Sequence, residues 1–167
     1  MLVLLLGSTV VACGRKAATN RAGPAKTTAA PATTTNSSTI ALTPADAPAC
    51  ALLLARVQRV TTALQTSSEL IAHSVDKRQL SQRIAIERVQ LRRSAQLMTG
   101  GPIPAPLEGA DRQLVLGLGA FADDFARAES PARHGDFSAA AQAMNDAAVV
   151  RVILGATKTI ENACGGG

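Results

Sequence analysis

The spacing of apolar residues from position 50 onward predicts helices. In the first segment apolar side chains recur at steps of 4, 3, 4 and 7, with polar side chains on the opposite face. A second segment, from Leu80 to Met98, repeats this spacing and carries a further apolar strip at Ile86, Val89 and Leu97, which predicts a helix buried on two sides. The apolar residues of the first segment are Leu53, Val57, Val60, Leu64 and Ile71.

Two more segments continue the pattern. One apolar face runs from Leu107 to Phe125, and another begins near Asp136 and continues to Ile160. The breaks between segments are rich in Gly and Pro: TGGPIPAP at 99–106 and ESPARHGD at 129–136. Asp76 and Asp136 are well placed as N-caps of the segments that follow them.

Four helical segments joined by short breaks predict an all-α domain over residues 50–164, an antiparallel up-down four-helix bundle. The alternative is a three-helix bundle in which the first two segments run together through SVDK at 74–77. Only 2% of residues are aromatic, so Ala, Leu, Val and Ile must fill the core, which favours close-packed helices. Residues 165–167 form a glycine tail.

Residues 13–49 have a different composition, dominated by Ala, Thr, Pro and Ser without an apolar period. Such a segment cannot bury enough surface to offset its ordering entropy, so we expect a disordered tether. With a root-mean-square reach of about 5–6 Å × √n, it would span roughly 30–35 Å. Ser/Thr stretches with Pro also occur as O-glycosylated stalks, which leaves glycosylation open.

The chain opens with an uncharged, mostly apolar run at residues 2–12. A membrane-spanning helix needs about 20 residues, whereas the core of a signal peptide has roughly 7–15. The run ends in VVAC at 10–13, which resembles the lipobox of bacterial lipoproteins. A signal peptide normally begins with basic residues, which are missing after Met1, so we expect the natural start upstream.

The resemblance implies that the Cys13 thiol receives diacylglycerol and that the bond between Ala12 and Cys13 is then cut. Residues 1–12 would be the signal peptide, and the protein would be held by lipid at the cell membrane, facing outside the cytoplasm. A thiolate is the nucleophile that accepts such a lipid. The alternative is a secretory signal followed by an incidental cysteine.

Once Cys13 is assigned to lipid, Cys50 and Cys164 remain, one at each end of the helical region. In an up-down bundle with an even number of helices, the first helix starts where the last one ends. We therefore predict a Cys50–Cys164 disulfide, which an oxidising compartment would permit. The alternative is two unpaired buried thiols.

The net charge of +5 is not evidence for nucleic-acid binding. Much of the excess lies next to the apolar N-terminus, where residues 14–49 carry a net charge of +3, and residues 50–167 carry only +2. The aromatic residues that stack on single strands are almost absent. We expect the basic residues near the N-terminus to meet anionic lipid. They are Arg15, Lys16, Arg21 and Lys26.

We expect no catalytic residues, no metal site and no cofactor. GLGAFA at 117–122 matches a dinucleotide-binding glycine pattern, but no second βα unit follows it; the two glycines fit better as a close helix–helix approach. His73 and His134 lack metal-ligand spacing. The side chains of Asp123 and Asp124 diverge by about 100° on a helix and are interpreted as solvated.

The basic residues of the second segment are scattered around its axis. We interpret them mainly as solvated or ion-paired, with an anionic cell-wall polymer as one partner. The functional hypothesis is an extracytoplasmic lipoprotein with a small non-catalytic domain that contacts a protein, lipid or anionic cell-wall partner. The alternative is a carrier or sensor that holds an apolar ligand or lipid between its helices. The basic residues of the second segment are Lys77, Arg78, Arg83, Arg88, Arg92 and Arg93.

Overall fold

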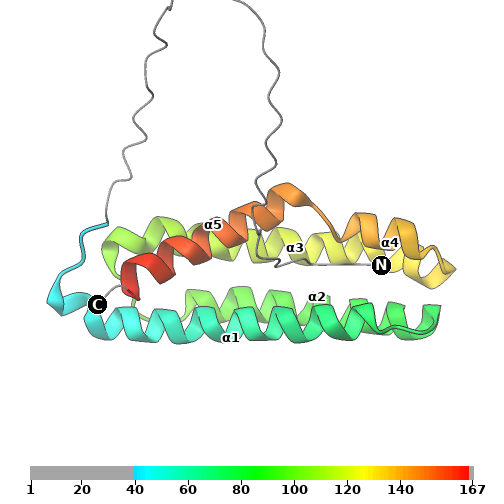
Figure 1. Ribbon diagram of the computed structural model, residues 1–167, viewed down its shortest axis with the longest axis horizontal. Helices are drawn as coiled ribbons and strands as arrows, with labels where there is room; N and C mark the ends of the chain where they lie inside the picture. The colour runs from blue at the N-terminus through cyan, green and yellow to red at the C-terminus, as the bar shows by residue number, and fades with distance from the viewer. Residues whose placement is uncertain (1–39, 166–167) are drawn as a thin grey trace, which may run out of the picture. The chain divides into compact units, whose positions relative to one another are not determined.

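The computed structural model describes residues 40–165, and every regular element in this range is helical. Figure 1 shows the helices along the chain. Two short 3-10 helices, η1 and η2, precede α1 and α3. The bounds are η1 Pro44–Asp46, α1 Ala47–Ala72, α2 Lys77–Thr99, η2 Ala105–Leu107, α3 Glu108–His134, α4 Phe137–Ala143 and α5 Ala147–Cys164. The expected all-helical bundle is confirmed.

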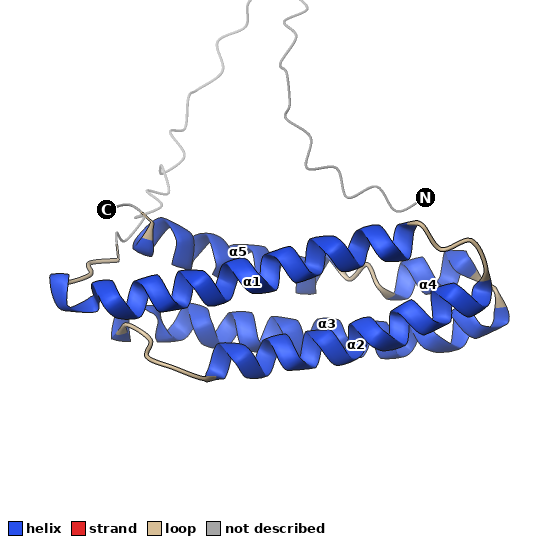
Figure 2. Cartoon of the chain, turned by 90° about the horizontal axis from the view of Figure 1, so that it is seen from below, coloured by secondary structure: helices blue, strands red, loops and turns tan. Residues whose placement is uncertain are grey.

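The four long helices pack so that each touches two of the others. α2 lies beside α1 and α3, and α5 lies beside α3 and α1, so α2 and α5 are on opposite corners of the bundle (Figure 2). The short helix α4 packs against α3. As a result the start of α1, the end of α2, the start of α3 and the end of α5 share one end of the bundle (Figure 1).

The core consists of the apolar stripes that the sequence predicts. Each of the first three apolar faces is largely buried, and the polar face of α1 is exposed. The largest fully buried apolar side chains are Leu53, Val57, Ile84, Leu91, Met98, Leu107, Leu114, Leu118 and Ile160. Ile40 and Leu42 pack on the core ahead of α1, so ordered structure begins before the expected domain boundary at residue 50.

Three details differ from the expectations. Ile86, Val89 and Leu97 are 52%, 44% and 53% exposed, so the second apolar strip of α2 is not buried in this chain. α3 continues past the expected stop and contains Pro131, because Gly135 ends the helix instead, in a left-handed conformation with φ 82°.

The third difference lies in the last segment, which is two helices and not one. α4 closes at Ala143, and the Asp146 carboxylate accepts hydrogen bonds from the backbone N–H groups of Ala148 and Val149 at 2.8 and 3.3 Å. This capping starts α5 anew. The predicted N-caps Asp76 and Asp136 are confirmed, since their carboxylates accept from Gln79 and Ala139.

Candidate functional site

The surface of α2 carries charge of one sign. Its single acidic residue, Glu87, is only 4% exposed and faces inward, whereas six basic residues lie on the same helix. Every charged side chain that α2 presents to solvent is therefore positive. An exposed face of one charge sign attracts ligands of the opposite sign.

A shallow groove of about 480 Å³ lies between the first half of α2 and the end of α3. Three of its side chains are cationic and two are uncharged hydrogen-bonding groups. It is lined by Lys77, Arg78, Ser81, Gln82, Ala85 and Arg133. The five α2 residues follow the i, i+4 spacing of one helix face, so the sequence contains a signal for them. Arg133 lies 48 or more positions away, and only the packing of α3 on α2 brings it in.

Local packing places the first cation of the groove. The α2 N-cap Asp76 holds the helix start, with 2.7 Å between its carboxylate and the Gln79 nitrogen. The aliphatic stem of Lys77 lies over Gly135, where an added Cβ would sit 3.6 Å from the Lys77 Cδ. The ammonium can therefore reach the solvent beyond an anchored stem.

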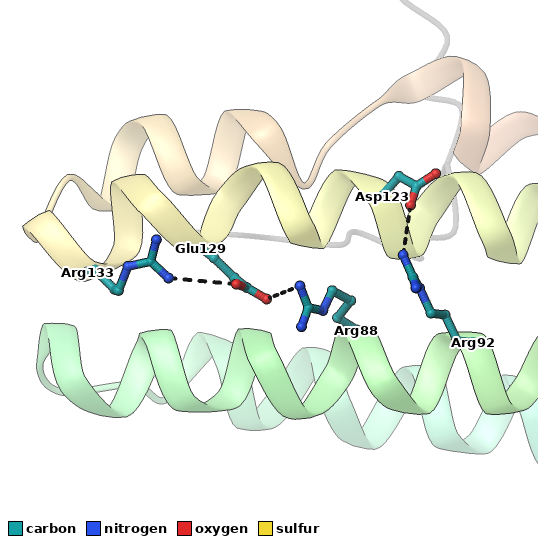
Figure 3. A network of polar contacts seen from close by, with 5 residues as sticks. All are labelled: Arg88, Arg92, Asp123, Glu129 and Arg133. Carbon is teal, nitrogen blue, oxygen red and sulfur yellow. Dashed lines mark hydrogen bonds and ion pairs between the residues drawn. The ribbon is translucent and has the colours of Figure 1, made fainter.

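Ion pairs cross the seam between α2 and α3, beginning at the groove residue Arg133 (Figure 3). Glu129 on α3 forms an ion pair with Arg88 at 2.9 Å and lies 3.7 Å from Arg133, so one carboxylate serves two guanidinium groups. Further along, Arg92 pairs with Asp123 at 3.3 Å. Within residues 40–165, Lys77 and Arg78 take part in no ion pair. Positive charge thus remains uncompensated at the groove end of the seam.

The arrangement suits recognition of an anion. Lysine and arginine supply charge, and Ser81 and Gln82 supply uncharged donors on the same face. The groove is open and half its lining is charged, so it desolvates a ligand little and favours extended or repeated anions over a small enclosed molecule.

Neither histidine belongs to this groove or to a metal site. Both are exposed, and a ring nitrogen of each contacts a backbone oxygen of its own helix: His73 with Glu69 at 2.6 Å and His134 with Ser130 at 2.8 Å. Across the described residues, no three His, Cys, Asp or Glu side chains gather in a way that could hold a metal ion.

The interpretation of both adjacent aspartates as solvated is wrong for one of them. The Asp123 side chain is 62% exposed, but Asp124 is only 1% exposed and contacts the Arg127 guanidinium. Burial raises the pKa of the Asp124 carboxyl, and the charge of Arg127 opposes that rise. A 100° step between neighbours separates the two residues but does not decide which of them faces the core.

GLGAFA lies in the middle of α3, so no strand and turn form around it. At Gly117 the close approach is confirmed, because an added Cβ would sit 2.8 Å from the Ile153 Cγ1 on α5. At Gly119 the prediction of a close approach is wrong, since an added Cβ would meet nothing within 4 Å.

The two ends of the helical domain meet at the cysteines. The Cα atoms of Cys50 and Cys164 are 5.3 Å apart, within the range of disulfides, although the residues are 114 positions apart. The predicted juxtaposition is confirmed. The expected lipid site Cys13 and cleavage residue Ala12 lie outside the described residues.

Among the described residues, no helix combines the length and the apolar character needed to cross a bilayer. Comparison with protein-family models, with curated proteins and with solved structures finds no match to this chain.

Proposed function

We propose that this protein is an extracytoplasmic lipoprotein, anchored in the cell membrane through Cys13, whose non-catalytic helical domain binds an anionic partner through α2. The observation that carries the binding role is the groove, where Lys77, Arg78 and Arg133 converge without enough carboxylate to neutralise them. No residue of this lining is a nucleophile paired with a base, which supports binding over turnover.

The anchor is supported by the VVAC motif and the apolar run before it. We expect Cys13→Ser to release the protein into the medium or to block its maturation, because the thiol that takes the lipid is gone. Membrane fractionation after a salt wash measures this. If the variant still sediments with the membrane, Cys13 is not the anchor.

The binding role is tested with inorganic polyphosphate immobilised on a column and the full chain as analyte. Reversing two charges in Lys77→Glu/Arg78→Glu should weaken retention about tenfold or more, since each cation near an anionic surface contributes roughly 1 kcal/mol. Retention of the unsubstituted chain should fall with added salt.

The matched control is Arg151→Glu/Lys158→Glu, which makes the same charge change on the exposed surface of α5. Net charge is then equal in the two variants, and only position differs. Equal loss of retention in both would mean that the chain binds polyanions by net charge alone, and the groove would lose its role.

The carrier hypothesis has less support. Apolar ligands bind in enclosed pockets lined by large apolar side chains, but the only apolar residue that lines the groove is Ala85. Native mass spectrometry of the protein purified from cells distinguishes the two, because a carrier would retain lipid in its folded domain.

A further inference from the structure

A single stripe runs along the outside of α2 and ends next to the groove. Its residues are spaced at steps of 4, 4, 3, 4 and 4, so they lie on one side of the helix. All six are exposed. The α2 stripe consists of Arg78, Gln82, Ile86, Val89, Arg93 and Leu97, and it shares Arg78 and Gln82 with the groove.

The bundle itself does not cover the α2 stripe. α2 packs against α1 and α3 through Leu80, Ile84 and Leu91, which are at most 6% exposed. The three aliphatic residues of the stripe are 44–53% exposed. Exposed apolar side chains gathered on one helix face are typical of surfaces that contact a membrane or another protein.

The charges on the stripe determine what that partner is. Arg78 and Arg93 are its only charged members; the nearest exposed carboxylate along the chain is that of the N-cap Asp76, which accepts a hydrogen bond from the Gln79 N–H. A second copy packed parallel would oppose each arginine to its own counterpart. Packed antiparallel, it would press Arg78 onto Leu97 and Arg93 onto Gln82. Either way arginines would be buried without an acidic partner, which is costly.

An anionic lipid surface can accommodate both the aliphatic and the basic side chains of the stripe. Aliphatic side chains bury between the headgroups, while arginine stems lie along the interface and their guanidinium groups contact lipid phosphates. We propose that the α2 stripe docks the helical domain onto an anionic phospholipid bilayer, with α2 lying in the interface plane. This rests on the proposed function, and it names lipid phosphate as the anion that α2 binds.

The chain contains no Trp and no Tyr, so one introduced tryptophan reports its own surroundings. The full chain carrying Leu97→Trp is mixed with phosphatidylglycerol vesicles whose acyl chains are brominated. Docking predicts a blue-shifted emission and strong quenching by bromine, with a much smaller effect in brominated phosphatidylcholine vesicles. Arg93→Glu in the same background should abolish the quenching in phosphatidylglycerol.

The matched control is Leu154→Trp on α5, across the bundle from α2, where Leu154 is 60% exposed. All variants share the same N-terminal segment, so any anchoring by that segment affects them equally. Should Leu97→Trp not fold, as judged by circular dichroism, Ile86→Trp is the second reporter on the stripe. Equal quenching of the stripe and α5 reporters, or none of either, overturns the proposal.

Two further outcomes separate this inference from the proposed function. If the chain is retained on polyphosphate but the stripe reporters are not quenched, α2 is still an anion-binding surface, but the lipid bilayer is excluded as its partner. A blue shift that grows with protein concentration in the absence of vesicles would assign the stripe to a second copy of the chain, and the lipid proposal would be wrong.

Discussion

At the scale of single residues, one buried arginine joins three helices. Arg56 of α1 is 7% exposed, and its guanidinium donates to the backbone oxygens of Met98 at 3.2 Å, Gly100 at 2.7 Å and Pro102 at 3.0 Å. These oxygens belong to the end of α2 and the segment after it. Burial raises the pKa of Asp111 on α3, and the positive charge of Arg56 opposes that rise.

Arg56→Met should therefore destabilise the fold. It leaves three carbonyl groups without this donor, the Met98 carbonyl in a buried contact, and removes the positive charge near Asp111, so we expect a loss of about 1–3 kcal/mol. Urea unfolding followed by circular dichroism measures this. Arg59→Met, an exposed position one turn on, should change stability by less than about 0.5 kcal/mol. A small effect at Arg56 would show that water replaces the guanidinium.

Glu87 provides a pH-dependent test. Burial raises the pKa of its carboxyl, and a hydrogen bond from Ser67 on α1 opposes the rise. Because the folded-state pKa lies above the unfolded-state value, the charged form is destabilising at neutral pH. That penalty disappears as the pH falls through the folded-state pKa towards the unfolded-state value.

Glu87→Gln should consequently stabilise the protein at pH 7, and its advantage should shrink as the pH falls through that window. Urea unfolding of both proteins at a series of pH values gives the difference in free energy. Glu69→Gln, on the exposed face of α1, provides the comparison. An advantage that does not change with pH would mean that the effect is not the charge of Glu87.

At the scale of helices, periodicity predicted the buried faces of α1, α2 and α3, since a 3.6-residue repeat is a direct record of which side meets the core. It could not predict that the apolar strip of Ile86, Val89 and Leu97 stays exposed, because pattern shows amphipathicity and not which partner is present. Pro131 was interpreted as a stop, yet α3 continues through it to His134 and forgoes the hydrogen bond that an N–H at position 131 would donate to the carbonyl of Arg127.

The groove was predictable only in part for the same reason. The spacing of Lys77, Ser81 and Ala85 places them on one face, but Arg133 joins them through the packing of α3 on α2. Asp146 was not predicted as the cap of α5. The four-residue step from Met144 to Ala148 keeps the helical spacing of apolar residues, so the spacing gives no sign of a break at Asp146.

The contact between α3 and α5 is tested by a pair of glycines two residues apart. Gly117→Ala should destabilise by about 1–3 kcal/mol, because its Cβ would sit 2.8 Å from the Ile153 Cγ1 and force the helices apart. Gly119→Ala should stabilise by up to about 1 kcal/mol, since its Cβ meets nothing and alanine favours the helix. Thermal and urea unfolding compare the two variants. If both substitutions change stability in the same direction, the close contact between α3 and α5 is not at Gly117.

At the scale of the whole molecule, the junction of Cys50 and Cys164 closes the domain. We predict a disulfide there in the exported protein, so unreduced, denatured protein should not label at either thiol. Cys50→Ser/Cys164→Ser should lose up to about 4–5 kcal/mol of unfolding free energy in the chain-entropy model, given the 114-residue separation. Reductant should lower the free energy of unfolding of the unsubstituted protein to the same value, whereas Cys13→Ser should leave that free energy unchanged.

The same junction gives the domain a property useful to engineering. Cys50, in the first turn of α1, and Cys164, at the end of α5, meet at one end with 5.3 Å between their Cα atoms, close to the gap left by opening a tight loop in another protein. The bundle can therefore be inserted into a host's surface loop as a guest, without stretching host or guest. For the same reason, joining the ends by a short linker and cutting between α2 and α3 would yield a circular permutant with its termini at the same end of the bundle.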